Sequence, residues 1–228
     1  MITIAIDGTS GVGKSSLADD LAARLGCVHL DTGAMFRGIG VYCIDNGIDI
    51  NDEKAVSEAL KDINEEIIYK DGAQYVIVNG VDQTGRLRTE DVSKAASVTS
   101  QYPAVRNKVL ELEREIARRE NCIMDGRDIG TVVLPDATLK LFLTASGEVR
   151  ADRRYRQLKA ADKLNGADYE SILADIKERD YRDSHRGIAP LKKADDAFEV
   201  ESSDMTIEEV KDCIEKLLQQ KLQASASE

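Results

Sequence analysis

Short apolar, β-branched runs alternate along the chain with segments in which apolar residues recur every three to four positions. The runs predict buried strands, and the periodic segments predict amphipathic helices. We expect strands at residues 2–6, 27–30, 122–124, 139–143 and 198–200. We expect helices at residues 14–25, 33–46, 89–100, from 103 onward, 148–159, 169–183 and 207–222. Strands that alternate with helices predict an α/β fold, with a five-stranded parallel sheet flanked by helices.

The stretch of residues 63–88 departs from this alternation. Two apolar runs are separated by Asp71-Gly72 and followed by Asn79-Gly80, and both pairs are strong hairpin signals. A small antiparallel β patch inside a strand–helix series is typical of an insertion. We therefore expect one domain, with a core of residues 1–58, 89–147 and 168–228 and an insert at 59–88 that includes part of the following helix. We expect only the last few residues to lack order.

Composition narrows the class of protein. Apolar residues make up 42% of the 228 residues, enough for a core, and no apolar run approaches the roughly 18 residues of a membrane span. The net charge of -11 argues against nucleic acid as a partner. The four cysteines are scattered without metal-binding spacing, which favours free thiols in a reducing cytoplasm. Nothing in the composition calls for a partner protein, so we expect a cytoplasmic monomer.

The candidate chemistry begins directly after the first predicted strand. Residues 8–15 match the pattern G-x4-G-K-[S/T] between a strand and a helix, which is the context that this motif requires. Glycines let successive backbone N–H groups turn toward phosphate oxygens, and the following helix adds its positive end. Lys14 would reach the β- and γ-phosphates, and the Ser15 hydroxyl suits Mg²⁺, which prefers oxygen ligands. The loop predicts a nucleotide site without naming the acceptor, because GTPases, motor ATPases and small-molecule kinases share it.

A second candidate anion site follows the strand at residues 122–124. That strand ends in Asp125-Gly126-Arg127-Asp128, and the carboxyl ends of core strands in a parallel sheet face the ligand crevice. Arg127 is therefore a candidate phosphate ligand, with a carboxylate on each side to fix it. The alternative is a loop arginine that is merely paired with Asp125 or Asp128.

Two arginine stripes occur later in this acidic chain. Arg150, Arg153 and Arg154 share one helix face by their spacing. A second face carries Arg179, Arg182, Asp183 and Arg186. Phosphoryl transfer uses such guanidiniums, since it depends on positioning and charge stabilisation. The alternative is a pair of solvated faces with ion pairs.

The combined motifs leave two classes open. A small-molecule kinase fits the loop and the arginines, although these motifs do not name its acceptor. A switch protein that hydrolyses nucleotide slowly would carry a guanine signature, and the sequence contains no N-K-x-D. His29 and His185 are expected to be structural or solvated, because transfer to an anionic oxygen needs no strong base.

With these motifs in hand, the chain resembles the bacterial cytidylate kinases, within the nucleoside monophosphate kinases. The resemblance covers residues 2–222 and rests on IAIDGTSGVGKSS, HLDTGAMFR, RTEDVSKAAS, PAVR, MDGRDIGTVV and IKERDYRDSHRGIAPL. It implies a P-loop kinase fold with a monophosphate-binding insert and a mobile helical lid at residues 148–167. It also implies a (d)CMP kinase, which transfers the γ-phosphoryl group of ATP to CMP or dCMP with Mg²⁺. The nearest alternative is another small-acceptor kinase of the same build, such as a uridylate or shikimate kinase.

The resemblance assigns residues to each substrate. ATP would be held by the loop and by the lid, through Gly8, Thr9, Ser10, Gly11, Val12, Gly13, Lys14, Ser15, Ser16, Arg150, Arg153 and Arg154. CMP would be held by Thr32, Arg37, Ser97, Arg106, Arg127, Asp128, Arg179, Asp183 and Arg186. Lys14, Arg127, Arg179 and Arg186 would serve catalysis, and Ser15 would bind Mg²⁺ together with the ATP phosphates.

The chain departs from the family pattern at a few positions. Thr32 stands where a serine is common, and Ser15 stands where many of these kinases have glycine. The lid segment at residues 159–168 is slightly long, which bears on the lid contacts.

Base selection has a simple chemical basis. Cytosine carries an amino donor where uracil carries a carbonyl acceptor. The carboxylate of Asp128 or the hydroxyl of Ser97 could accept from that amino group, whereas uracil would leave acceptor against acceptor.

Overall fold

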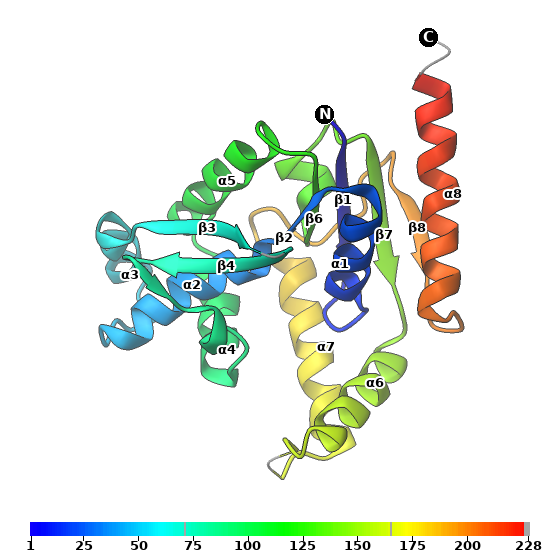
Figure 1. The fold of residues 1–228 in the computed structure, drawn as a ribbon. Coiled ribbons are helices and arrows are strands. Elements are labelled where there is room, and N and C mark those ends of the chain that lie inside the picture. Colours follow the sequence, from blue (N-terminus) through cyan, green and yellow to red (C-terminus); the bar gives the residue numbers. More distant parts are fainter. Residues whose placement is uncertain (71, 165, 226–228) are drawn as a thin grey trace. The chain divides into compact units, whose positions relative to one another are not determined.

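The computed structural model describes residues 1–70, 72–164 and 166–225 (Figure 1). The strands are β1 (Thr3–Gly8), β2 (Val28–Asp31), β3 (Glu65–Lys70), β4 (Ala73–Val78), β5 (Val81–Asp82), β6 (Cys122–Gly126), β7 (Leu139–Thr144) and β8 (Phe198–Glu201). The α-helices are α1 (Lys14–Leu25), α2 (Thr32–Asp45), α3 (Glu53–Ala59), α4 (Glu90–Thr99), α5 (Pro103–Ala117), α6 (Gly147–Ala160), α7 (Tyr169–His185) and α8 (Ile207–Ser225). Short helical turns lie at η1 (Leu60–Asp62), η2 (Thr84–Arg86) and η3 (Ile129–Val133).

The strands form two sheets, as the sequence predicts. The larger sheet has five strands in the order β2-β6-β1-β7-β8. Its pairs β2–β6, β1–β7 and β7–β8 are parallel. The smaller sheet is antiparallel, in the order β3-β4-β5. The α/β class, the five-stranded sheet and the antiparallel patch are confirmed.

The hairpin turns of the small sheet follow the predicted chemistry. Asn79 and Gly80 have φ angles of 50° and 79°, so the Asn-Gly pair forms the tight turn between β4 and β5. Gly72 has a φ of 77°, while Asp71 lies outside the described residues. Asn165 of the predicted lid also lies outside the described residues. So do residues 226–228, which include the last few residues that were expected to lack order.

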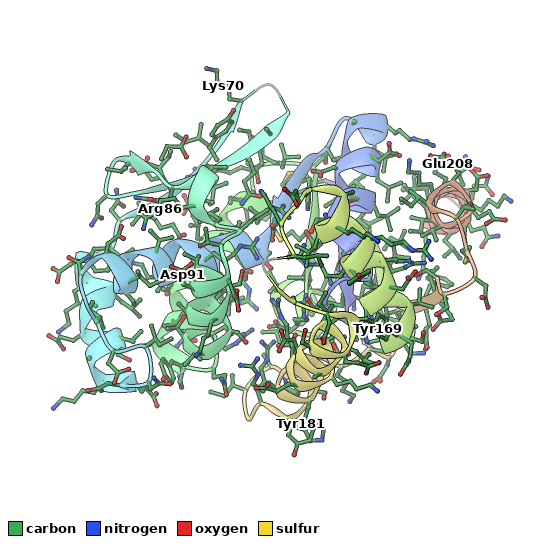
Figure 2. All side chains as sticks on the ribbon, turned by 90° about the horizontal axis from the view of Figure 1, so that it is seen from below. Lys70, Arg86, Asp91, Tyr169, Tyr181 and Glu208 are labelled. Carbon is green, nitrogen blue, oxygen red and sulfur yellow. The ribbon has the colours of Figure 1, made fainter. Side chains whose placement is uncertain are left out.

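Local chemistry explains where several helices begin. The Asp31 carboxylate accepts from the Ala34 N–H and caps α2, and Asp52 caps α3 in the same way. Pro103 opens α5, where its missing N–H costs nothing. A capping box between Asp168 and Ser171 starts α7. Near the other end of α7, the exposed ring of Tyr181 (Figure 2) stacks on His185.

By its contacts the chain forms two compact units. One consists of Ala22–Asp125 with Met1, and the other consists of Ile2–Leu21 and the chain from Gly126 onward. In the first unit, α2 packs against α4 and β4. In the second, α6 packs against α7, and α8 packs against β7. The predicted boundaries of core, insert and lid stay a prediction.

Buried apolar side chains centre on the large sheet. Ile4, Ile6, Ile123, Leu139 and Leu141 are at most 1% exposed. Burial of such side chains is the main driving force of folding. No helix in the described part of the chain combines the length and the apolar character needed to cross a bilayer.

Candidate phosphate-binding sites

The predicted phosphate loop has a backbone that only glycine adopts easily. Gly8, Gly11 and Gly13 have φ angles of 151°, 76° and 100°. A Cβ on Gly8 would lie 2.0 Å from the backbone oxygen of Leu143 in β7, so a side chain is excluded there. The loop therefore curls between β1 and α1 as its sequence requires.

Lys14 is the first residue of α1, and its side chain returns to the loop. Its Nζ donates to the backbone oxygens of Gly8, at 2.9 Å, and Thr9, at 2.8 Å. Lys14 is only 5% exposed, so a buried positive charge lies directly at the loop. In the first turn of α1, Ser15 is half-buried and Ser16 is exposed.

Asp7 links the loop to the segment after β6 and was not among the predicted site residues. Its carboxylate accepts from the backbone N–H groups of Ile129 and Gly130, both at 2.7 Å. Burial raises the pKa of Asp7 from 3.8 to about 6, although these two hydrogen bonds act in the opposite direction. The signal in the sequence was a carboxylate that ends an otherwise apolar strand. Asp7 thus fixes the η3 turn that follows Arg127 and Asp128.

The predicted lid arginines form hydrogen bonds with separate groups. Arg150 is 4% exposed, and its guanidinium binds both carboxylate oxygens of Asp180 on α7, at 3.1 and 2.5 Å. It also donates to the backbone oxygen of Ser10 in the loop, at 2.9 Å. Arg153 donates to the backbone oxygen of Ser202, and Arg154 donates to the Gln157 side chain. The three guanidiniums do not share a partner, and their contact with ATP stays a prediction.

The second arginine stripe meets the segment after β6. Arg127 Nε donates to Asp183 Oδ2 at 2.7 Å, and Arg186 Nη2 donates to Asp128 Oδ1 at 2.9 Å. Asp128 and Arg186 are almost fully buried at their side chains. The structure therefore brings together residues from two distant parts of the sequence. The carboxylate that fixes Arg127 in this way comes from α7, whereas the sequence pointed to its two neighbours.

Arg127, Arg179 and Arg186 form an arginine cluster, and their charge acts on the pKa of Asp183. Burial alone would raise the pKa of Asp183 above its ordinary value of 3.8. The charges of Arg127, Arg179 and Arg186, with the hydrogen bond from Arg127, outweigh burial and lower the pKa. Asp183 therefore stays ionised near neutral pH and holds the guanidiniums in place, which is the behaviour expected of a site for a multivalent anion.

The other unit contains the predicted acceptor residues of α2. Arg37 Nη2 donates to Asp31 Oδ2 at 2.6 Å, and Asp31 is the N-cap residue of the same helix. Thr32 is buried and its hydroxyl donates to the backbone oxygen of Asp125 at 2.9 Å. His29 Nε2 lies 2.7 Å from Asp125 Oδ1, and the structural role expected of this histidine stays a prediction. His185, by contrast, is exposed on α7.

Ser97 and Arg106, the residues expected to read the base, lie on α4 and α5. Arg106 is 9% exposed, and its guanidinium carbon lies 5.6 Å from the centre of the Phe36 ring. Its Nη1 donates to the backbone oxygen of Ser100 at 3.3 Å. Ser97 is half-buried in the last turn of α4. A buried, preplaced guanidinium suits recognition of a polar base edge.

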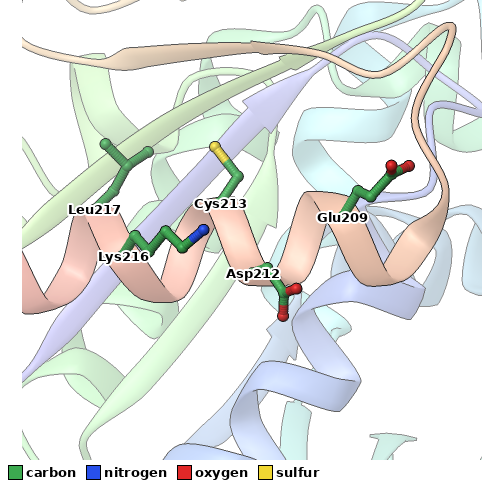
Figure 3. A pocket seen from close by; sticks show the side chains of 5 residues that line it. All are labelled: Glu209, Asp212, Cys213, Lys216 and Leu217. Atoms are coloured by element: carbon green, nitrogen blue, oxygen red, sulfur yellow. The ribbon is translucent and has the colours of Figure 1, made fainter.

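An open depression of about 330 Å³ lies elsewhere, along α8 (Figure 3). Its lining residues, Glu209, Asp212, Cys213, Lys216 and Leu217, all come from that one helix. It contains none of the predicted site residues. Among the described residues, no group of three or more His, Cys, Asp or Glu side chains is arranged to hold a metal ion.

Comparison with known proteins places the chain. A family model for cytidylate kinase matches residues 4–220. The cytidylate kinase of Caldicellulosiruptor saccharolyticus is 44% identical over 209 residues, which is 92% of this chain and 92% of that protein. The cytidylate kinase of Lactobacillus johnsonii is 43% identical over 221 residues, covering 97% and 95% of the two chains.

A solved structure agrees with the fold. The shikimate kinase of Bacteroides thetaiotaomicron matches with a TM-score of 0.50 at 13% identity, over 96% of this chain and 98% of that one. At that identity the likeness concerns the fold alone, which is that of a P-loop kinase. The match over nearly the whole sequence carries the stronger conclusion: this chain belongs to the cytidylate kinase family.

Proposed function

We propose that this protein transfers the γ-phosphoryl group of ATP to CMP, and also to dCMP, with Mg²⁺ as the cofactor. The observation that carries the proposal is a G-x4-G-K-S loop of the required backbone shape, in a chain that belongs to the cytidylate kinase family. The protein is on this view a nucleoside monophosphate phosphotransferase that forms CDP and dCDP.

The loop is the proposed donor site. Phosphate oxygens of ATP would accept hydrogen bonds from Lys14 in place of the backbone oxygens of Gly8 and Thr9, to which it now donates. The Ser15 hydroxyl, half-buried at the start of α1, is a hard oxygen of the kind that Mg²⁺ prefers. Mg²⁺ commonly keeps water and substrate phosphates as its other ligands, so one protein oxygen fits. When bound, the ion would neutralise charge on the triphosphate.

The acceptor residues divide by chemistry. Arg37 and Arg127 are the proposed ligands of the CMP phosphate, and Thr32 and Asp183 would hold the sugar. Arg179 and Arg186 would stabilise charge on the phosphoryl group in transfer, since catalysis of this reaction is largely electrostatic.

Base selection would use the remaining acceptor residues. Ser97, Arg106 and Asp128 are the proposed readers of cytosine. One oxygen of Asp128 accepts a hydrogen bond from Arg186, and this contact would orient the carboxylate for that role.

The acceptor supplies its own nucleophile. A phosphate monoester oxygen is already anionic near neutral pH, so no side chain needs to remove a proton. This agrees with the site, where His29 is tied to Asp125. The side chains must therefore place that oxygen in line with the γ-phosphorus.

An acceptor panel tests the proposal. ADP release is followed with ATP·Mg²⁺ and, separately, CMP, dCMP, UMP, AMP and shikimate. We expect CMP and dCMP to support turnover far better than the others, and Lys14→Ala to lower that turnover by about 100-fold or more. ATP hydrolysis that ignores CMP would contradict the proposal and favour a binding or switch protein. Preference for UMP or shikimate would show that the acceptor is not CMP. A monomeric state and a cytoplasmic location stay predictions.

A further inference from the structure

Two guanidiniums approach the same carboxylate oxygen in the unit that contains α2. Arg37 Nη2 lies 2.6 Å from Asp31 Oδ2, and Arg88 Nη2 lies 3.9 Å from that oxygen. Arg88 belongs to the RTEDVSKAAS motif, between η2 and α4, and none of the roles proposed above uses it. Its side chain is 80% exposed, whereas those of Arg37 and Asp31 are 16% and 17% exposed.

The position of Asp31 is set by other contacts. Its Oδ1 accepts from the Ala34 N–H at 3.1 Å as the cap of α2. Its backbone N–H donates to Gln74 Oε1 at 2.8 Å, and its backbone oxygen accepts from Gln74 Nε2 at 3.3 Å. The carboxylate is therefore held by the backbone of α2 and by strand β4. Arg37 and Arg88 approach an anion whose place is fixed in advance.

The charges around that oxygen do not balance. Two guanidiniums with one carboxylate leave one positive charge in excess. Arg37 Nε is buried and has no hydrogen-bond partner in the described part of the chain. A buried donor without an acceptor is unfavourable, and an incoming anion with several oxygens would relieve it. A phosphate dianion supplies both the missing charge and the missing acceptors.

The distance between Arg88 and Asp31 is too long for a closed ion pair. A settled ion pair between these groups would have its nitrogen and oxygen within about 3 Å. At 3.9 Å and 80% exposure, the Arg88 guanidinium stands beside the carboxylate without closing on it. The neighbouring Leu87 is buried and anchors the segment, so Arg88 projects from a fixed backbone. A flexible side chain on a fixed backbone can close on a ligand at little cost.

We propose that Arg88 is a further ligand of the acceptor's phosphate group, acting with Arg37, and that the Asp31 carboxylate stands in for that phosphate in the free protein. The inference rests on the proposed function, because it assumes that a nucleoside monophosphate is the acceptor. It adds a residue of the insert to the phosphate site. The insert then senses the phosphate group through Arg88 and through Gln74, which holds Asp31.

Calorimetric titration with CMP and with cytidine isolates the phosphate contact. The variants are Arg88→Gln, Arg88→Lys and, as a matched control, Arg86→Gln. Arg86 lies two residues away with the same charge, but it binds Asp45 through two hydrogen bonds, at 2.8 and 2.6 Å (Figure 2). All four proteins are checked for the same thermal midpoint within a few degrees, and Arg88→Gln should pass because its side chain is exposed.

Arg88→Gln should weaken CMP binding by about 10- to 100-fold, the usual effect of losing a charged hydrogen bond. Cytidine binding should stay within about twofold, because cytidine lacks the phosphate. Arg88→Lys should recover part of the loss, since lysine keeps the charge but not the fork of donors. The KM for CMP should rise while the KM for ATP is unchanged, and Arg86→Gln should change neither.

Three results would overturn the inference. Arg88→Gln could leave CMP binding unchanged, could weaken CMP and cytidine equally, or could match Arg86→Gln. Each would make Arg88 a surface or structural residue. Failure of the proposed function looks different: the wild-type protein itself would bind CMP no more tightly than cytidine and would not phosphorylate it, which would overturn both proposals.

Discussion

Glu65 provides the sharpest test of the physical reasoning, because a carboxyl group is buried there with little to compensate it. It is the first residue of β3 and only 9% exposed. Its Oε1 has no hydrogen-bond partner among the described residues. A Cβ on Gly38 of α2 would lie 2.1 Å from that oxygen, so the carboxyl packs directly against the helix. Burial raises the pKa of Glu65 from 4.5 to about 8, although the charge of Lys108 opposes this.

The raised pKa has a definite consequence for stability. Below pH 4.5 the carboxyl is protonated in both folded and unfolded chains, and no penalty exists. Between 4.5 and about 8 the unfolded chain is ionised while the folded one keeps its proton. The free energy of unfolding therefore falls by about 1.4 kcal/mol for each pH unit across this window, to a total of about 5 kcal/mol. Above pH 8 the penalty is constant.

Glu65→Gln removes this titration while keeping the shape of the protonated side chain. The variant and the wild type should have similar stabilities near pH 5. Near pH 8.5 the variant should be more stable by about 5 kcal/mol, a large part of the usual stability of a domain. Urea unfolding followed by circular dichroism at pH 5, 6, 7, 8 and 8.5 measures this. With a slope of about 3 kcal/mol per molar urea, the midpoints should separate by about 1.7 M.

The matched control is Glu66→Gln, at the exposed neighbouring position, where the same charge is removed from the surface. Its stability should run parallel to that of the wild type across the pH range. The reasoning about Glu65 would be refuted if the Glu65→Gln profile also ran parallel to the wild type. A difference that is largest at low pH would be equally damaging, since it would give the effect the opposite sign.

Two further predictions concern the phosphate loop. Gly8→Ala should lower the free energy of unfolding by about 3 kcal/mol and abolish ATP binding, because its Cβ would meet the Leu143 backbone oxygen. Gly26→Ala is the control, as its φ of 64° costs about 1–2 kcal/mol but its Cβ has open space; equal effects in urea unfolding would contradict the steric argument. Asp7→Asn should remove a loss of stability of about 3 kcal/mol that the wild type shows between pH 4 and 6, because the pKa of Asp7 is raised to about 6. A Glu65→Gln, Asp7→Asn double variant that still loses this stability between pH 4 and 6 would show that another group is responsible.

Much of the fold could be predicted because apolar periodicity and turn chemistry agree along this chain. The helix at residues 14–25 was predicted with its observed bounds, and the Asn-Gly turn formed as expected. Helix α3 was missed although Asp52, a capping residue, precedes Val56 and Ala59 at helical spacing. Its seven residues were too short for periodicity to stand out. The η3 turn had no signal at all, because the tertiary contact of Asp7 helps to form it.

The contacts of the candidate site residues were harder to predict than their places on strands and helices. Motif spacing placed Arg127 after a core strand and Asp183 on a helix face, but nothing in the sequence linked the two. The role of Arg150 at ATP stays a prediction, and its contacts with Asp180 and with the loop at Ser10 had no signal in the sequence. Pairings of this kind depend on how distant segments meet in three dimensions. A single sequence contains the candidates but not the assignment.

The ion pairs explain how an acidic chain can receive anionic substrates. The net charge is -11, yet an aspartate pairs with each of four guanidiniums, those of Arg37, Arg127, Arg150 and Arg186. The aspartates offset repulsion between guanidiniums and fix their directions before a substrate arrives. Because the pKa of Asp183 is lowered, this carboxylate keeps its charge down to acidic pH and loses its stabilising effect only below its ordinary range. Between pH 4 and 8, where the raised pKa values of Asp7 and Glu65 make stability depend on pH, Asp183 therefore keeps the charge that holds Arg127.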